Sequence, residues 1–179
     1  MGWAPAITLL SRGCFPPLAP IALVQCKQRR MYAPGRPWPF RWAGGCTMPN
    51  DRSPAGFVWD DPSVLTCSIH EDGRYLYPGT GAVEETGPAY AAVNVPLPPG
   101  TTGDTWLWAF EQGILPALEA FAPEALVLQM GTDAHFLDPL AHLNVAAQDW
   151  LEAVRLVKEA GLPIVALGGG GYSLDTVPR

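Results

Sequence analysis

From Trp59 onward, apolar and polar residues alternate in blocks whose lengths fit strands and helices. The apolar runs at 64–70 (VLTCSIH), 90–97 (YAAVNVPL) and 125–130 (ALVLQM) have the length of strands. The third run is apolar throughout, which is typical of a strand buried on both faces. A last buried strand is predicted at 162–172, where LPIVALGGGGY runs into four glycines.

Two helices are predicted between these strands. Residues 105–121 have a helical pattern, with Asp104 as the expected N-cap and Pro116 as the expected site of a kink. Residues 146–161 form an amphipathic helix that Gly161 ends. The side chains expected on its packing face are Trp150, Leu151, Val154, Leu156 and Val157.

The succession of strand, helix, strand, helix and strand predicts an α/β fold, with a parallel sheet joined by crossover helices. In such sheets, ligands bind beyond the carboxyl ends of the strands. GTDAHFLDPL (131–140) and GGGGY (168–172) both fall at those ends. We therefore expect these two loops to be neighbours and to carry the functional chemistry.

Residues 1–57 differ from the rest of the chain in composition. They contain nine of the twenty prolines, three of the four cysteines and seven of the eleven basic residues. Their net charge is +6, whereas residues 58–179 carry −12. The prolines exclude long helices and interrupt strands. We predict an unrelated Pro/Arg/Cys-rich leader that is irregular and poorly ordered, followed by an α/β domain from residue 58.

The composition argues against several classes of partner. The net charge of −6 lacks the clustered basic residues that nucleic acid requires. No run approaches the ~20 apolar residues of a membrane span, and the N-terminus lacks the basic region of a signal peptide. The leader cysteines have no CxxC spacing and no His among them, which excludes a zinc finger. We expect a cytoplasmic protein with neither nucleic-acid nor membrane partners.

The loop GTDAHFLDPL allows two interpretations. Asp133, His135 and Asp138 could ligate a metal, or they could form a polar loop in which the carboxylates cap turns and His135 is solvated. A DxH spacing alone is a weak metal signal, because one loop rarely supplies a whole site. Asp133, directly after the buried strand, is the better candidate ligand. Asp138 is expected to cap a turn, and His142 to lie on the surface.

The sequence GGGGY has a more specific interpretation. Four glycines allow the backbone to approach a ligand closely and to adopt positive φ. They place Tyr172 at the end of the strand, where its hydroxyl can donate a hydrogen bond to a developing oxyanion. The alternatives are a structural turn with Tyr172 packed as an aromatic residue, and a phosphate cradle. The chain has no GxxxxGK[ST] motif to support the phosphate cradle.

Residues 59–179 resemble the zinc-dependent histone deacetylase superfamily, and most closely its bacterial acetoin-utilisation (AcuC-like) deacetylases. The resemblance rests on WDDPSVLTCSIHEDGRYLYPGTG, VNVPLPPGT, VLQMGTDAHFLDPL and LGGGGYSLD, which occur in the family's order. It implies an arginase/deacetylase-type fold and zinc-dependent hydrolysis of an acetyl-lysine-like amide. The implied substrate is an acetyl-lysine protein or a small acetylated amide.

The resemblance also implies roles for individual residues. Asp133 matches one of the three protein ligands of the family's Zn²⁺. Tyr172 matches the tyrosine that polarises the acetyl carbonyl and stabilises the tetrahedral intermediate. The remaining matches are substrate-binding positions at Tyr77, Leu140, Gly169 and Gly170, and positions of a monovalent-cation (K⁺) site at Ser68 and Ile69.

The sequence departs from the family at the positions that activate water. The family's DxH metal ligands and its pair of catalytic histidines are expected upstream of Trp59, but no His precedes His70. A catalytic zinc usually needs three protein ligands. We therefore expect a truncated and inactive member of the family. The alternatives are a non-catalytic binding module of the same fold and a manganese-dependent ureohydrolase, which GGGGY and PGTG disfavour.

Overall fold

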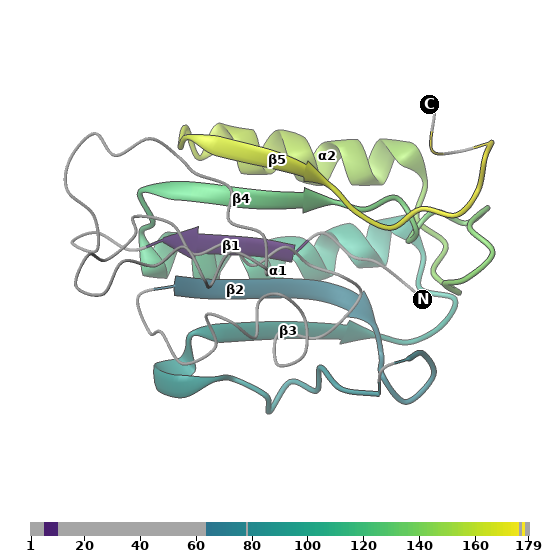
Figure 1. Cartoon of the computed structure of the whole chain (residues 1–179), viewed down its shortest axis with the longest axis horizontal. Coiled ribbons are helices and arrows are strands. Elements are labelled where there is room, and N and C mark those ends of the chain that lie inside the picture. Colours follow the sequence, from purple (N-terminus) through teal and green to yellow (C-terminus); the bar gives the residue numbers. More distant parts are fainter. Residues whose placement is uncertain (1–5, 11–63, 78, 176, 178–179) are drawn as a thin grey trace, which may run out of the picture.

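A computed structural model describes residues 6–10, 64–77, 79–175 and 177 (Figure 1). Within these ranges the strands form one five-stranded sheet in the order β3-β2-β1-β4-β5. The elements are β1 (Ala6–Leu10), β2 (Val64–Glu71), the 3-10 helix η3 (Pro88–Tyr90), β3 (Ala92–Leu97), α1 (Gly103–Phe121), β4 (Ala125–Met130), α2 (Ala147–Glu159) and β5 (Ile164–Gly168).

The sheet has the predicted parallel α/β character. β2 pairs with β3 in parallel, and β4 pairs with β5 in parallel. Figure 1 shows these four strands pointing the same way, with α1 and α2 together behind the sheet. The predicted crossover helices are therefore confirmed. No helix within the described ranges has the length and apolarity of a membrane span.

β1 is an addition to the predicted sheet. It lies between β2 and β4 and runs antiparallel to both (Figure 1). It comes from the 1–57 segment, which the sequence marks as irregular, and it occupies the five residues that directly follow Pro5. The rest of that segment lies outside the described residues, so the predicted disorder of the leader stays a prediction.

The two parallel strands after α1 differ in burial. Leu126, Val127 and Leu128 of β4 are buried, as expected for a strand covered on both faces. β5 was also predicted to be buried, and this is wrong: its residues are half-buried or exposed. Among the described strands β5 is the last of the sheet, and there it has a hydrogen-bonded neighbour on one side only.

Helix α1 packs on β2 and β3 through one apolar stripe. Its buried side chains recur at helical spacing, and Gly113 lets the helix approach β3, since a Cβ there would lie 2.8 Å from a Val95 methyl group. The helix begins after Thr102 rather than after Asp104, and it continues through Pro116. The buried residues of α1 are Gly103, Trp106, Ala109, Phe110, Ile114 and Leu118.

Helix α2 buries a narrower face than its pattern predicts. Ala153 and Val157 are its buried residues, whereas Leu151, expected to pack, is 58% exposed. The Asp149 carboxylate accepts a hydrogen bond from the Ala146 N–H at 3.1 Å and so caps the start of the helix. Ala153 and Val157 belong to the same hydrophobic core as the buried residues of α1.

Trp106 and Trp108 give a matched test of the core. Trp106 is fully buried, and Trp108, two residues later in α1, is 62% exposed. The Trp106 indole N–H has no hydrogen-bond partner within the described residues, so its loss removes packing alone. We expect Trp106→Ala to lower the free energy of unfolding by about 3–5 kcal/mol and Trp108→Ala by about 0.5 kcal/mol or less, measured by urea titration. Equal losses would contradict the assigned face of α1.

Candidate active site

The loops that follow β4 and β5 lie side by side, as predicted. β4 and β5 pair in parallel up to the register Met130–Gly168, so both loops leave the sheet at the same edge. Beyond that point the Thr132 N–H donates to the Gly170 carbonyl at 2.7 Å. The Tyr172 N–H donates to Oδ2 of Asp138 at 2.8 Å. The two loops thus form one hydrogen-bonded unit.

Glycine is required where these loops meet. A Cβ at Gly169 would lie 2.7 Å from the backbone nitrogen and Cα of Gly131. Gly171 has φ of 152°, and a Cβ there would lie 2.3 Å from Oγ1 of Thr132. Any side chain at these positions would push the loops apart. The glycines therefore bring the segment before Tyr172 into contact with the segment that carries Asp133.

Two carboxylates of the first loop are buried. Asp133 has no exposed surface, and Asp138 is 7% exposed. Asp138 caps a turn, as expected, since its Oδ1 accepts the Leu140 N–H at 3.0 Å. Its second oxygen binds the Tyr172 N–H, which the sequence analysis missed because Tyr172 lies 34 residues further along the chain. The sequence signals for Asp133 were its place directly after an apolar strand and its match to a family ligand, whereas Asp138 had only the signal of a turn.

His135 is partly buried rather than fully solvated. Its ring stacks on Phe136 with centroids 4.5 Å apart, and its Nδ1 accepts the Leu137 N–H at 3.2 Å. Partial burial lowers the pKa of His135, and the nearby Asp138 carboxylate opposes this effect. Both of these contacts of the His135 ring are therefore with residues of its own turn.

The predicted catalytic tyrosine and the predicted substrate-binding residues are exposed to different extents. Tyr172 is 43% exposed and Tyr77 is 62% exposed, while Leu140 is half-buried. Gly169 is exposed and Gly170 is buried, consistent with a glycine loop that lines a surface on one side only. Tyr172 thus combines a backbone N–H bound to Asp138 with a side chain that is exposed to solvent.

A groove of about 360 Å³ lies next to this unit, and the predicted substrate-binding residues do not line it. It opens between the first loop and the start of α2, where Trp150 Nε1 donates to the Gly131 carbonyl at 3.1 Å. Asp133 and Tyr172 do not line it. The lining residues are Thr132, His135, Phe136, Leu137, Val145, Ala146, Ala147, Gln148, Trp150, Leu151 and Val177.

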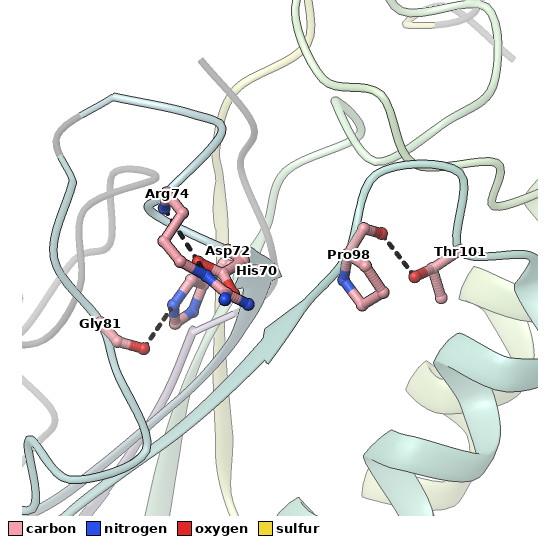
Figure 2. A network of polar contacts seen from close by, with 6 residues as sticks. All are labelled: His70, Asp72, Arg74, Gly81, Pro98 and Thr101. Atoms are coloured by element: carbon pink, nitrogen blue, oxygen red, sulfur yellow. Dashed lines mark hydrogen bonds and ion pairs between the residues drawn. The ribbon is translucent and has the colours of Figure 1, made fainter.

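His70 connects the predicted cation site to the loop that carries Tyr77. Its Nε2 lies 3.1 Å from the Gly81 carbonyl, and its Nδ1 lies 3.0 Å from Oγ of Ser68. Figure 2 shows the ring directed at Gly81, beside the ion pair of Asp72 and Arg74.

The protonation state of this histidine follows from its partners. A carbonyl only accepts, so Nε2 carries the proton, and burial lowers the pKa of His70 and favours the neutral ring. Nδ1 of the neutral ring then accepts the Ser68 hydroxyl proton. The lone pairs of Ser68 Oγ then remain available as acceptors, and the role of Ser68 in a cation site stays a prediction. Ile69, which lies between Ser68 and His70 in the chain, is fully buried.

A buried glutamate at the end of β2 holds the far part of the first loop. The Glu71 side chain is fully buried, and its two oxygens bind the His142 N–H at 2.7 Å and the His142 Nδ1 at 2.9 Å. His142 lies on the surface, as predicted, but its pairing with Glu71 could not be read from the sequence.

Two adjacent hydrogen bonds anchor the stretch around His142 to the turn after β3: Gly100 N–H to the His142 carbonyl at 2.7 Å, and Asn144 N–H to the Thr101 carbonyl at 2.8 Å. Thr101 in turn donates to the Pro98 carbonyl at 2.6 Å (Figure 2).

The described residues do not form a zinc site. Within residues 64–77, 79–175 and 177, no group of three His, Cys, Asp or Glu side chains is placed to hold a metal ion. Asp133 is fully buried, but within these ranges it is not joined by two further candidate ligands.

Comparison with known proteins identifies the family. The profile of the histone deacetylase domain matches residues 55–179. The chain belongs to the histone deacetylase family. Over 130 residues it is 39% identical to the acetoin utilization protein AcuC of Bacillus subtilis, covering 68% of this chain and 34% of that protein.

Solved structures of the histone deacetylase family share its fold. A histone deacetylase homologue from Aquifex aeolicus has a TM-score of 0.61 and 34% identity, over 64% of this chain and 32% of that one. An acetylpolyamine aminohydrolase from Burkholderia pseudomallei has a TM-score of 0.66 and 28% identity, over 72% of this chain and 39% of that one. The predicted arginase/deacetylase-type fold is confirmed. The chain spans about a third of the length of these relatives.

The buried His70 predicts a pH dependence of stability. Because burial lowers its pKa, the unfolded chain takes up a proton as the pH falls below about 6.5, while the folded chain does so only at lower pH. The free energy of unfolding should therefore decrease as the pH falls through this window. We expect a smaller decrease in His70→Gln, measured by urea titration from about pH 7.5 to about pH 5.5. The compared quantity is the slope with pH, and equal slopes in both proteins would refute the assignment.

Proposed function

We propose that this chain carries the carbonyl-binding part of a deacetylase-type amidohydrolase site. The observation that carries the proposal is the hydrogen-bonded junction of the two loops, which joins the segment of Asp133 to the segment of Tyr172. In this proposal Asp133 is one metal ligand, and Tyr172 donates a hydrogen bond to the acyl oxygen of the substrate. The family membership supports both roles.

The chemistry assigned to Tyr172 fits its surroundings. Its side chain is partly exposed at the carboxyl edge of the sheet, where ligands bind in α/β folds. A hydroxyl fixed at that point stabilises negative charge on the carbonyl oxygen as an amide is attacked, and one such donor is commonly worth about 10²–10³ in rate. Leu140 and Tyr77 would line the path of the acyl chain, with Gly169 and Gly170 beneath it.

We infer that the chain as printed does not turn over substrate. In deacetylases zinc activates the attacking water, but Asp133 alone cannot hold it, and the family's paired histidines have no counterpart before His70. We therefore assign no step to a metal here. A non-catalytic binding module is the second candidate, and the same shortage of ligands favours it.

The proposed substrate is an acetylated amine. The relatives include an AcuC protein and an acetylpolyamine aminohydrolase, so both an acetyl-lysine peptide and an acetylated polyamine are probes of choice. The Ser68 hydroxyl, with its proton directed at His70, supports a monovalent cation such as K⁺ beneath the site. Zn²⁺ and K⁺ remain parts of the proposal.

A fluorogenic acetyl-lysine assay with added Zn²⁺ tests the inferred inactivity. We expect the 179-residue chain to release no more product than zinc in buffer, because the water-activating groups are missing. Turnover that Tyr172→Phe abolishes and Tyr90→Phe preserves would contradict this expectation. Tyr90 is the matched control, since it is 81% exposed and undergoes the same loss of a hydroxyl.

A graft tests the proposed roles directly. Residues 55–179 would replace the corresponding segment of Bacillus subtilis AcuC, which then supplies the groups missing here. We expect an active enzyme that loses activity in Asp133→Ala and loses about 10²–10³ in kcat in Tyr172→Phe. A graft that folds and keeps its activity in both variants would disprove the roles of these residues.

A further inference from the structure

The Asp138 carboxylate makes more contacts than a turn requires. Asp138 is 7% exposed, yet each of its oxygens accepts a backbone N–H. Oδ1 binds Leu140 at 3.0 Å, which is the ordinary bond of an Asx turn. Oδ2 binds Tyr172 at 2.8 Å, in a different loop. A local turn explains the first bond but not the second.

The backbone of the second loop depends on bonds of this kind. Gly168 to Gly171 precede Tyr172 and have no side chains to hold them in place, so the segment is intrinsically free to adopt many conformations. Two hydrogen bonds to the first loop fix it: Thr132 N–H to the Gly170 carbonyl at 2.7 Å, and Tyr172 N–H to Asp138. The second bond acts at Tyr172 itself. A charged acceptor makes it the stronger kind of hydrogen bond.

The burial of Asp138 makes its hydrogen bonds to Leu140 and Tyr172 more costly to break. A buried carboxylate is costly unless hydrogen bonds satisfy its oxygens. Here the backbone N–H groups of Leu140 and Tyr172 satisfy one oxygen each. Moving either residue would leave an oxygen of a buried carboxylate without its donor. The carboxylate therefore holds both backbones at a fixed separation.

We propose that Asp138 is a positioning residue that sets Tyr172 and Leu140 relative to each other. This inference rests on the proposed function, in which Tyr172 contacts the acyl oxygen and Leu140 lines the acyl path. Asp138 itself does not contact the substrate in this proposal. It acts through the two backbone N–H groups, and it belongs to the same short loop as Asp133. One carboxylate thereby couples the metal-ligand loop to the carbonyl donor.

Amide hydrogen exchange of the ¹⁵N-labelled 179-residue chain tests the proposal. Asp138→Asn keeps the shape but supplies one side-chain oxygen instead of two, so at least one of the Leu140 and Tyr172 amides should exchange about tenfold faster or more. Asp138→Ala should accelerate both amides. Asp138→Glu keeps two carboxylate oxygens and should restore part of the protection. Asp175→Asn is the matched control, because Asp175 is an exposed carboxylate in the loop that carries Tyr172. This variant should change neither amide.

The readout separates positioning from a general loss of stability. The amides of Leu126 and Leu128 in β4 report global opening, and they should exchange as in the unaltered chain. The Tyr172 amide proton should also shift upfield in Asp138→Asn, because it loses a charged acceptor. Unchanged exchange and shift at both Leu140 and Tyr172 in Asp138→Asn, with β4 protected, would overturn the proposal.

Failure of this inference is distinct from failure of the proposed function. The amide measurement needs neither metal nor turnover, so it reports on Asp138 whatever the chain catalyses. If the amides respond but the grafted enzyme ignores Tyr172→Phe, the contact is real and the function assigned to it is wrong. If the grafted enzyme needs Tyr172 but the amides do not respond, Tyr172 is positioned by other groups and the inference fails.

Discussion

The parallel pairing of β4 with β5 is the constraint on which the candidate site depends. It ends at the register Met130–Gly168, and from there two chain segments leave the sheet at the same edge and in the same direction. Their backbones meet so closely that a Cβ at Gly169 would lie 2.7 Å from Gly131. Loops from parallel neighbours reach one edge in any α/β sheet, but this contact holds them in register. Asp133 and Tyr172 are brought into one unit only because of it.

Three buried carboxylates lie at this edge, and two of them have visible structural tasks. Glu71 holds the His142 end of the first loop to β2, and Asp138 holds Leu140 and Tyr172. Each is satisfied by hydrogen bonds, as a buried charge must be. Asp133 is fully buried and is followed within five residues by Asp138. The loop after β4 is thus fixed at two points that follow the residue proposed as a metal ligand, Asp138 and His142.

Much of this arrangement could be predicted from the sequence, and the limits have physical causes. The apolar run 125–130 and the helical spacing of residues 105–121 were enough to predict β4 and α1. The expected parallel order of the strands was enough to predict that the two loops are neighbours. Burial of β5 was predicted wrongly because an apolar run does not indicate whether a strand lies at the edge of a sheet. The contacts of Asp138 with Tyr172 and of Glu71 with His142 span 34 and 71 residues, so no local pattern contains them. β1 was missed for the same reason, since its partners are distant in the chain.

We propose that this chain holds one ligand of a deacetylase-type zinc site, Asp133, without the other two. Calorimetric titration of the 179-residue chain with Zn²⁺, in parallel with Asp133→Ala, tests it most directly. Asp133→Ala leaves the leader cysteines in place, so any zinc that their thiolates bind contributes equally to both titrations. We predict the same weak binding in both proteins, with no stoichiometric tight site that depends on Asp133. A tight one-to-one site that disappears in Asp133→Ala would contradict the claim and show that the chain completes its metal centre.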